Sequence, residues 1–234
     1  MINKIKREIF DFFPSRILDR REFITDDMIQ KVEEVRIRVG QPICIRNHIK
    51  EDFSEEVIST EDIKRILENF SNNSIYSVQD EINSGFITIQ GGHRIGITGT
   101  CVLEKDTIKN IKYISSLNIR VAREVKDCSN EVLNRIIKNQ KFENTLILSP
   151  PGCGKTTLIR DMIRKLSNGS NINKSYQIGV VDERAEIAAM YKGVPQNEIG
   201  KRTDVMNHCK KIIGMKLLIR SMGPEIIATD EIRW

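Results

Sequence analysis

The sequence predicts an α/β protein in two parts, a smaller α+β domain followed by a parallel-sheet core. In the first half, short runs of alternating apolar and polar residues are separated by turn residues. In the second half, apolar runs of strand length are separated by helical or long connections, the pattern of a doubly wound parallel sheet. We place the first domain at residues 1–125, a helical connector at 126–143 and the core at 144–234.

The composition is that of an ordinary soluble protein. Of the 234 residues, 39% are hydrophobic and 29% are charged, and 37 basic against 32 acidic residues give a net charge of +5. This mild excess argues for neither nucleic acid nor an anionic membrane, and we expect no nucleic-acid partner. No run approaches the roughly 20 apolar residues of a membrane span. The N-terminus lacks the apolar core of a signal peptide, so a cytoplasmic location is expected.

The five cysteines indicate a reducing compartment rather than a disulfide framework. They form no C-x-x-C pair and show no zinc-ligand spacing. His208 and Cys209 are adjacent but have no companion ligands, so we expect no metal there.

In the first domain, segment 35–45 predicts a hairpin with one buried face, because apolar residues alternate with arginine before a turn at residues 40–42. A helix follows at about residues 60–70, where apolar residues recur at helical spacing after a capping box of Ser59 and Asp62. The glycine-rich stretch from residue 85 to 125 alternates again and predicts two to four further strands.

In the second half, Ser129 is expected to cap a short helix at residues 131–141. An apolar run, Thr145–Leu148, predicts a strand that leads into a glycine-rich loop. A helix is predicted from about residue 155 to 166. Two further apolar strands, within "YQIGVVDER" and "EIIATDE", both end in acidic residues.

The glycine-rich loop "SPPGCGKT" matches the phosphate-binding pattern G-x-x-x-x-G-K-S/T, except that serine replaces the first glycine. Gly152 and Gly154 let successive backbone N–H groups face a phosphate, and the helix N-terminus adds partial positive charge. Lys155 would reach the β- and γ-phosphate oxygens, and the Thr156 hydroxyl would bind Mg²⁺. Because strand, loop and helix all agree, a chance glycine turn is disfavoured. The predicted nucleotide-binding residues are Ser149, Pro150, Pro151, Gly152, Cys153, Gly154, Lys155, Thr156 and Thr157.

Two acidic strand ends supply candidate catalytic residues. After "IIAT", Asp230 is predicted to hold Mg²⁺ and Glu231 to position or deprotonate the attacking water. After "IGVV", Asp182 and Glu183 are either a solvated acidic strand end or a second catalytic pair, and the residues alone leave both open.

Basic residues could neutralise charge on a γ-phosphate, in the same chain or from a neighbouring subunit. The ordinary alternative is a solvated basic face. The candidate arginines are Arg94, Arg120, Arg123 and Arg220.

Together these motifs resemble the stage III sporulation protein AA family of ATPases from endospore-forming bacteria. The resemblance covers about residues 30–232 and rests on "SVQDEINSGFITIQGGHRIGITGTCV", "ISSLNIRVARE", "PPGCGKTTLIRD", "VVDERAEIA" and "IRSMGPEIIATDEI". It implies a P-loop NTPase core of the RecA-like or AAA+-like kind that uses ATP and Mg²⁺ and is related to type II and type IV secretion and pilus motor ATPases. It also implies a location in the mother-cell cytoplasm, and we expect such an ATPase to be a homo-oligomer, a hexamer with its sites at subunit interfaces. That hexamer would associate peripherally with the membrane proteins of a sporulation channel complex.

The resemblance also assigns roles to individual residues. It implies that Glu183 is a catalytic glutamate, with Asp182 beside it. Segment 220–225 corresponds to the family's R-x-x-P-D run, with glycine inserted and glutamate for aspartate. Arginines of the N-terminal domain reach the nucleotide in such motors, which favours Arg94, Arg120 and Arg123.

The chain differs from the family pattern in stopping at "DEIRW", where further strands are expected. We therefore expect a C-terminally truncated core in which nucleotide binding survives better than turnover. Two other functions stay open. One is a nucleotide-gated scaffold that does not hydrolyse ATP. The other is a nucleic-acid-dependent motor, suggested by the basic stretches.

Overall fold

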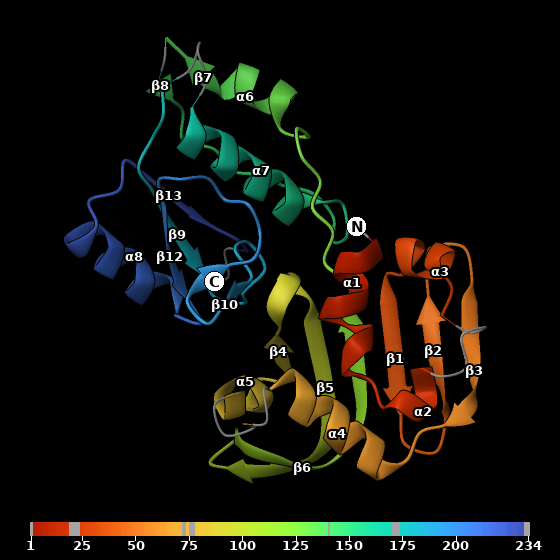
Figure 1. Cartoon of the computed structure of the whole chain (residues 1–234). Coiled ribbons are helices and arrows are strands. Elements are labelled where there is room, and N and C mark those ends of the chain that lie inside the picture. Colours follow the sequence, from red (N-terminus) through yellow and green to blue (C-terminus); the bar gives the residue numbers. More distant parts are fainter. Residues whose placement is uncertain are drawn as a thin grey trace. The chain divides into compact units, whose positions relative to one another are not determined.

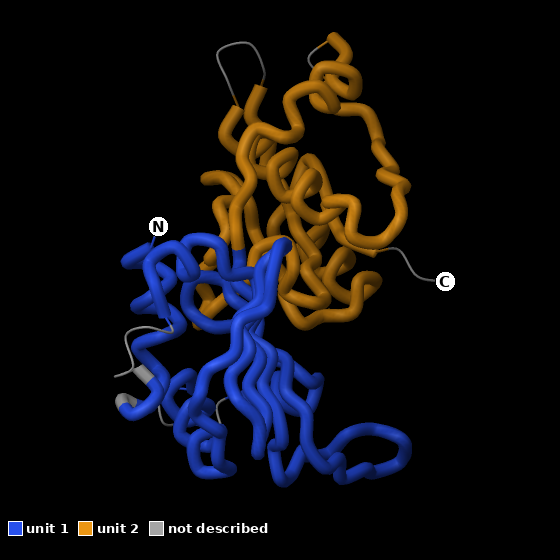
Figure 2. Tube along the Cα trace, turned by 90° about the vertical axis from the view of Figure 1, so that its right-hand side faces the viewer, with its two compact units in different colours: residues 1–122 blue, residues 123–234 orange. Residues whose placement is uncertain are grey.

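The structure, a computed structural model, describes residues 2–18, 24–71, 74, 78–139, 141–169 and 174–231. The chain divides into two compact units, Met1–Ala122 and Arg123–Trp234, which Figure 2 shows in different colours. The predicted connector segment lies inside the second unit.

The first unit is built on a six-stranded antiparallel sheet in the order β3-β2-β1-β6-β5-β4. The strands are β1 (Glu34–Arg38), β2 (Pro42–Arg46), β3 (Glu51–Val57), β4 (Phe86–Thr88), β5 (Arg94–Glu104) and β6 (Thr107–Arg120). The predicted hairpin over residues 35–45 is confirmed as β1 and β2, and the stretch from residue 85 supplies three of these strands.

Helices of the first unit pack against one face of this sheet (Figure 1). They are α1 (Ile2–Glu8), α2 (Ser15–Leu18), α3 (Asp26–Lys31), α4 (Thr60–Phe70) and α5 (Gln79–Asn83), with short 3-10 turns η1 (Phe10–Phe12) and η3 (Gln90–Gly92). The core joins isoleucines of the strands to apolar residues of α1, α3, α4 and α5. The Ser59–Asp62 capping box at the start of α4 is confirmed, with both reciprocal hydrogen bonds present.

The second unit contains a parallel sheet in the order β12-β9-β13, as the sequence predicts. Its strands are β9 (Ile178–Asp182), β12 (Thr203–Asn207) and β13 (Ile226–Thr229), and its helices are α6 (Asn130–Ile136), α7 (Lys155–Asn168) and α8 (Lys211–Ser221). Two small hairpins complete it: β7 (Ile137–Lys138) with β8 (Lys141–Phe142), and β10 (Met190–Tyr191) with β11 (Val194–Pro195). A second apolar core joins α6, α7 and the sheet.

The predicted strand Thr145–Leu148 is wrong. Within the described part of the chain no neighbouring strand forms a hydrogen-bonded ladder with it. Only Ile147 of this run packs against the core, whereas Leu146 and Leu148 are 67% and 83% exposed. An apolar run becomes a strand only where a partner strand satisfies its backbone groups, and the sequence of the run does not contain that partner.

Ser129 precedes α6, as predicted, but its side chain does not cap the helix. Its hydroxyl and its backbone N–H instead both donate to Oδ2 of the buried Asp161 on α7, at 2.7 and 2.9 Å. Arg164 donates to the other carboxylate oxygen. Helix α6 also ends at Ile136, earlier than predicted, because the β7–β8 hairpin begins there.

Asp161 is therefore the brace between the start of α6 and α7. Burial alone would raise its pKa, but the hydrogen bonds from Ser129 and Arg164 outweigh burial and hold the pKa of Asp161 far below its usual 3.8. None of the described helices is long and apolar enough to cross a membrane.

We predict that Asp161→Asn lowers the free energy of unfolding of the second unit at pH 7 by about 2 kcal/mol, since it weakens charged hydrogen bonds in a buried position. The stability that comes from a depressed carboxyl pKa is present above about pH 4 and is lost as the pH falls further. Urea unfolding at pH 7 and pH 3 should therefore show the difference shrink in acid. Asp127→Asn, which also removes a partner of Arg164 but is exposed, should stay close to wild type; an equal loss in both variants would contradict the brace.

Candidate functional site

The phosphate-loop motif spans residues 149–156, of which residues 149–154 precede α7 and Lys155 and Thr156 begin it. Gly152 and Gly154 have φ angles of +77° and +78°, in the left-handed region that favours glycine, and an added Cβ at either position would meet no atom within 4 Å. Gly154 is the N-cap of α7 and offers no capping side chain. The first N–H groups of the helix are thus left for another acceptor, which makes this end of α7 suited to an anion.

Lys155 lies along its own loop. Its ammonium donates to the carbonyl oxygens of Ser149 and Pro150 at 2.8 and 2.9 Å. These are neutral acceptors, which bind an ammonium less strongly than a phosphate oxygen does. Thr156 and Thr157 follow in the first turn of α7, both half-buried. The remaining predicted loop residues, Pro151 and Cys153, are exposed.

The two predicted acidic strand ends meet at one edge of the sheet. Strands β9 and β13 are parallel neighbours, with Thr229 opposite Val181. Asp182, the last residue of β9, and Asp230, the residue after β13, are next in this register and stand side by side.

Asp182 is fully buried and anchors the loop that follows β9. Its carboxylate accepts hydrogen bonds from the backbone N–H groups of Glu186, Ile187 and Ala188, at 2.8 to 3.2 Å. These bonds occupy both oxygens, so the contacts support a positioning role for Asp182. Direct participation of Asp182 in catalysis stays a prediction.

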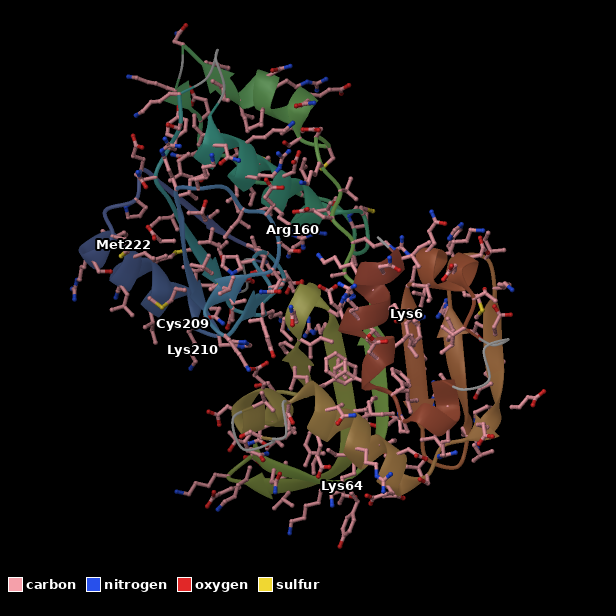
Figure 3. The ribbon with its side chains drawn as sticks, in the orientation of Figure 1. Lys6, Lys64, Arg160, Cys209, Lys210 and Met222 are labelled. Carbon is pink, nitrogen blue, oxygen red and sulfur yellow. The ribbon has the colours of Figure 1, made fainter. Side chains whose placement is uncertain are left out.

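Arg160 on α7, labelled in Figure 3, also holds this loop. Its guanidinium donates to the carbonyl oxygens of Glu186 and Ile187, at 2.7 and 2.9 Å. Burial lowers the pKa of this guanidinium, although nearby carboxylates act in the opposite direction. Arg160 is five residues after Lys155, about 7–8 Å along the helix axis. Through Arg160, the helix that begins at the phosphate loop is therefore bonded to the loop that follows the acidic end of β9.

Asp230 differs from the other acids at this edge because it is buried without a hydrogen-bond donor. Its side chain is 3% exposed, and neither carboxylate oxygen has a hydrogen-bond partner. Burial, together with the neighbouring charge of Asp182, raises the pKa of Asp230 to about 6, although Lys211 acts against this rise. A buried carboxylate without donors is costly. Two free oxygens of this kind suit a bound cation, directly or through water.

The neighbouring glutamates are both ion-paired. The ammonium of Lys211 lies 2.5 Å from Oε2 of Glu183, and also 3.6 Å from Oδ1 of Asp230. The guanidinium of Arg184 lies 3.5 Å from Oε2 of Glu231. Four acids thus gather at the ends of two neighbouring strands, β9 and β13, and of these Asp230 is the one whose carboxylate oxygens accept no hydrogen bond.

The sequence reasoning did not identify Arg160 or Lys211. Arg160 lies within an amphipathic helix and Lys211 at the end of the basic run "HCKK", so neither is marked by a motif. A lysine at the first position of a helix is a weak signal, since the helix dipole disfavours a cation there. That position becomes informative only once the two strand ends are known to lie beside it.

The predicted arginines are dispersed. Arg94 and Arg120 lie opposite each other on β5 and β6 of the first unit. The Arg94 guanidinium lies over the Phe86 ring, 3.5 Å from its centroid, and Arg120 pairs with Glu34 at 3.5 Å. Arg123 begins the second unit. Their contact with a nucleotide stays a prediction.

Arg220 is exposed near the far end of α8. It lies nine residues, roughly 13 Å along the helix axis, from Lys211 and the acidic edge. Arg220 of the same chain is therefore poorly placed to act at this edge, and a role from a neighbouring subunit stays a prediction.

The fold is that of a P-loop NTPase, with a parallel sheet and a phosphate loop before α7. The solved structures that resemble it include the Legionella pneumophila ATPase DotB, with a TM-score of 0.53 and 16% identity, covering 92% of this chain and 57% of that one. They also include the pilus retraction motor PilT with bound ADP, with a TM-score of 0.58 and 16% identity, covering 89% and 58%. The chain thus spans less than two thirds of these structures, and at such identity the likeness shows the fold alone.

The chain belongs to the family described as Sporulation stage III, protein AA, whose model matches residues 4–233. A curated relative, stage III sporulation protein AA of Bacillus subtilis (strain 168), is 37% identical over 225 residues, which are 96% of this chain and 73% of that protein. The family resemblance inferred from the motifs is thereby confirmed.

We predict that Arg160→Met loosens the loop after β9, because it leaves the carbonyl oxygens of Glu186 and Ile187 without this donor. The expected loss is about 1–3 kcal/mol of local stability, seen as faster amide hydrogen exchange at Ile187 and Ala188. Lys192→Met, in the exposed turn between β10 and β11, is the matched control. Unchanged exchange in the Arg160 variant would contradict the proposed clamp.

We predict that Asp230→Asn stabilises the protein at pH 8 in EDTA. A carboxyl whose folded pKa is raised to about 6 adds stability below its unfolded value of 3.8 and loses it as the pH rises through 6. The variant should exceed wild type by on the order of 2–3 kcal/mol at pH 8, because the shift is about two pKa units. In urea unfolding this gain should be much smaller at pH 4. Glu231→Gln is the control, and a gain independent of pH would contradict the assigned cause.

Proposed function

We propose that this chain binds ATP with Mg²⁺ and hydrolyses it, as a P-loop ATPase of endospore formation. The observation that carries the proposal is Asp230, a buried carboxylate with no hydrogen-bond donor at the strand end beside β9. The phosphate loop at the start of α7 supplies the complementary half. Membership of the sporulation family and the fold of DotB and PilT support the same function.

The phosphates would bind at the start of α7. The left-handed glycines expose successive N–H groups of the loop, and the helix terminus adds partial positive charge. Lys155 would exchange the carbonyl oxygens of Ser149 and Pro150 for phosphate oxygens, a stronger charge-assisted contact.

The residues present fit a magnesium ion. The described residues contain no cluster of three His, Cys, Asp or Glu side chains that would form an all-protein metal site. Mg²⁺ in nucleotide sites needs few protein ligands, because phosphates and water supply the others. Thr156 and Asp230 would hold it here. When bound, the ion would neutralise charge that develops on the phosphates.

Two carboxylates are candidates for orienting the attacking water. Glu231 follows Asp230 directly and pairs with Arg184, whereas Glu183 pairs with Lys211. Either ion pair must open, or move, before its carboxylate accepts a proton from water. Because both glutamates are held in ion pairs, a second candidate function is a nucleotide-gated scaffold that binds ATP without hydrolysing it.

The family membership supports a proposal for the setting of this activity. The ATPase would be cytoplasmic in the mother cell, peripheral at the membrane, and would energise the assembly or operation of a channel complex facing the forespore. A hexamer would let Arg94, Arg120 or Arg123 reach a nucleotide. Membrane proteins of that complex are the proposed partners.

We predict that Lys155→Ala weakens ATP binding by tenfold or more, since it removes a charged contact with the phosphates. Equilibrium binding of a fluorescent ATP analogue measures this, and Lys192→Ala serves as the control. Steady-state hydrolysis by wild type, absent in Lys155→Ala, would support the enzyme. Binding by wild type without hydrolysis would favour the scaffold, and equal binding by both proteins would refute the nucleotide site.

A further inference from the structure

Lys211 is the first residue of α8 and reaches the acidic edge from the side of that helix. Figure 3 labels the two preceding residues, Cys209 and Lys210, which mark where the helix begins. The Lys211 side chain is 17% exposed, and its ammonium touches carboxylates from two different strand ends. It therefore joins Glu183, after β9, to Asp230, after β13.

The position of this lysine is unfavourable for the helix itself. The N-terminus of a helix carries partial positive charge, so acids are preferred in the first turn and cations are disfavoured. The first turn of α8 contains no acid, and Lys210, its N-cap residue, makes no side-chain cap. The carboxylates that Lys211 contacts, rather than helix stability, account for a cation at this place.

The two contacts of Lys211 differ in kind. The 2.5 Å distance to Glu183 is a charge-assisted hydrogen bond, whereas 3.6 Å to Asp230 is too long for one. Lys211 thus neutralises part of the charge at Asp230 but leaves both oxygens of Asp230 without a donor.

The surrounding charges make this partial neutralisation important. Asp182, Glu186 and Glu231 all disfavour a negative charge on Asp230, and Lys211 favours it. The other cations of this edge have partners of their own, since Arg160 binds backbone carbonyls and Arg184 pairs with Glu231.

We propose that Lys211 and a divalent cation are alternative partners of Asp230, so that Lys211 is a positioning residue that sets the affinity of the site for the metal. The proposal rests on the proposed function, in which a divalent cation accompanies the nucleotide. A cation that takes Oδ1 of Asp230 would repel the ammonium, which keeps its shorter bond to Glu183. Lys211 and Glu183 would then shift together, which would couple the metal site to the loop after β9.

The test uses Mn²⁺ alone, without nucleotide, and the full chain. Lys211→Met should bind Mn²⁺ more tightly than wild type, by about five- to tenfold, the scale of one partly exposed charge contact. Electron paramagnetic resonance of free Mn²⁺ measures the affinity. Lys211→Arg retains the charge and should stay within about twofold of wild type. Lys216→Met, exposed on the same helix, should not change the affinity, and Asp230→Asn should abolish binding.

Thermal unfolding gives a second readout that does not depend on Mn²⁺ spectroscopy. In EDTA, Lys211→Met should melt below wild type, because it removes the cation beside two acids. Mn²⁺ should then raise its melting temperature by more than it raises that of wild type. If Lys211→Met is poorly folded, Lys211→Gln replaces it, because it also removes the charge but keeps an N–H donor for Glu183; it should show the same gain in Mn²⁺ affinity, and an affinity equal to wild type would overturn the proposal.

Three outcomes would overturn the proposal: Mn²⁺ binding to Lys211→Met that equals or falls below wild type, binding to Lys211→Arg as tight as to Lys211→Met, or no binding to any of them. Nucleotide binding by wild type and Lys155→Ala in EDTA is measured alongside. If nucleotide binds and Lys211→Met shows no gain, the proposed function stands and the role of Lys211 fails. If no nucleotide binds, the proposed function itself fails.

Discussion

The arrangement of the second unit depends on one constraint: the electrostatic repulsion among carboxylates that the parallel sheet brings to one edge. Parallel pairing of β9 and β13 brings Asp182, Glu183, Asp230 and Glu231 together. Neighbouring like charges repel, and burial makes the charges of Asp182 and Asp230 more costly still. Three of the four acids have a partner that offsets this repulsion. Asp182 accepts backbone N–H groups, Glu183 pairs with Lys211, and Glu231 pairs with Arg184. Asp230 alone has no hydrogen-bond donor.

This arrangement also explains how the loop after β9 is fixed. Asp182 satisfies its N–H groups, and Arg160 satisfies the carbonyl oxygens of Glu186 and Ile187. Arg160 belongs to the helix whose first turn carries the phosphate loop. A displacement of α7 would therefore move the loop after β9 through the two hydrogen bonds of Arg160. The hairpin-rich first unit has its own apolar core, which contains none of these residues.

Much of this architecture is predictable from the sequence because its signals are local. The capping box of α4, the β1–β2 hairpin, the left-handed glycines of the phosphate loop and the two acidic strand ends are all written in neighbouring residues. Features that depend on a distant partner were missed or mistaken. Thr145–Leu148 has the composition of a strand but no ladder, and Ser129 bonds to Asp161 rather than to its own helix. The role of Lys211 could not be predicted, because its partners Glu183 and Asp230 lie after β9 and β13, one before and one after it in the sequence.

The central claim is that Asp230 and the phosphate loop form one metal-dependent nucleotide site. The most direct measurement is the affinity for an ATP analogue, with and without Mg²⁺, in wild type and Asp230→Asn. Mg²⁺ should strengthen binding to wild type and leave binding to Asp230→Asn unchanged, while the two proteins bind equally in EDTA. An equal effect of Mg²⁺ on both proteins would contradict the account.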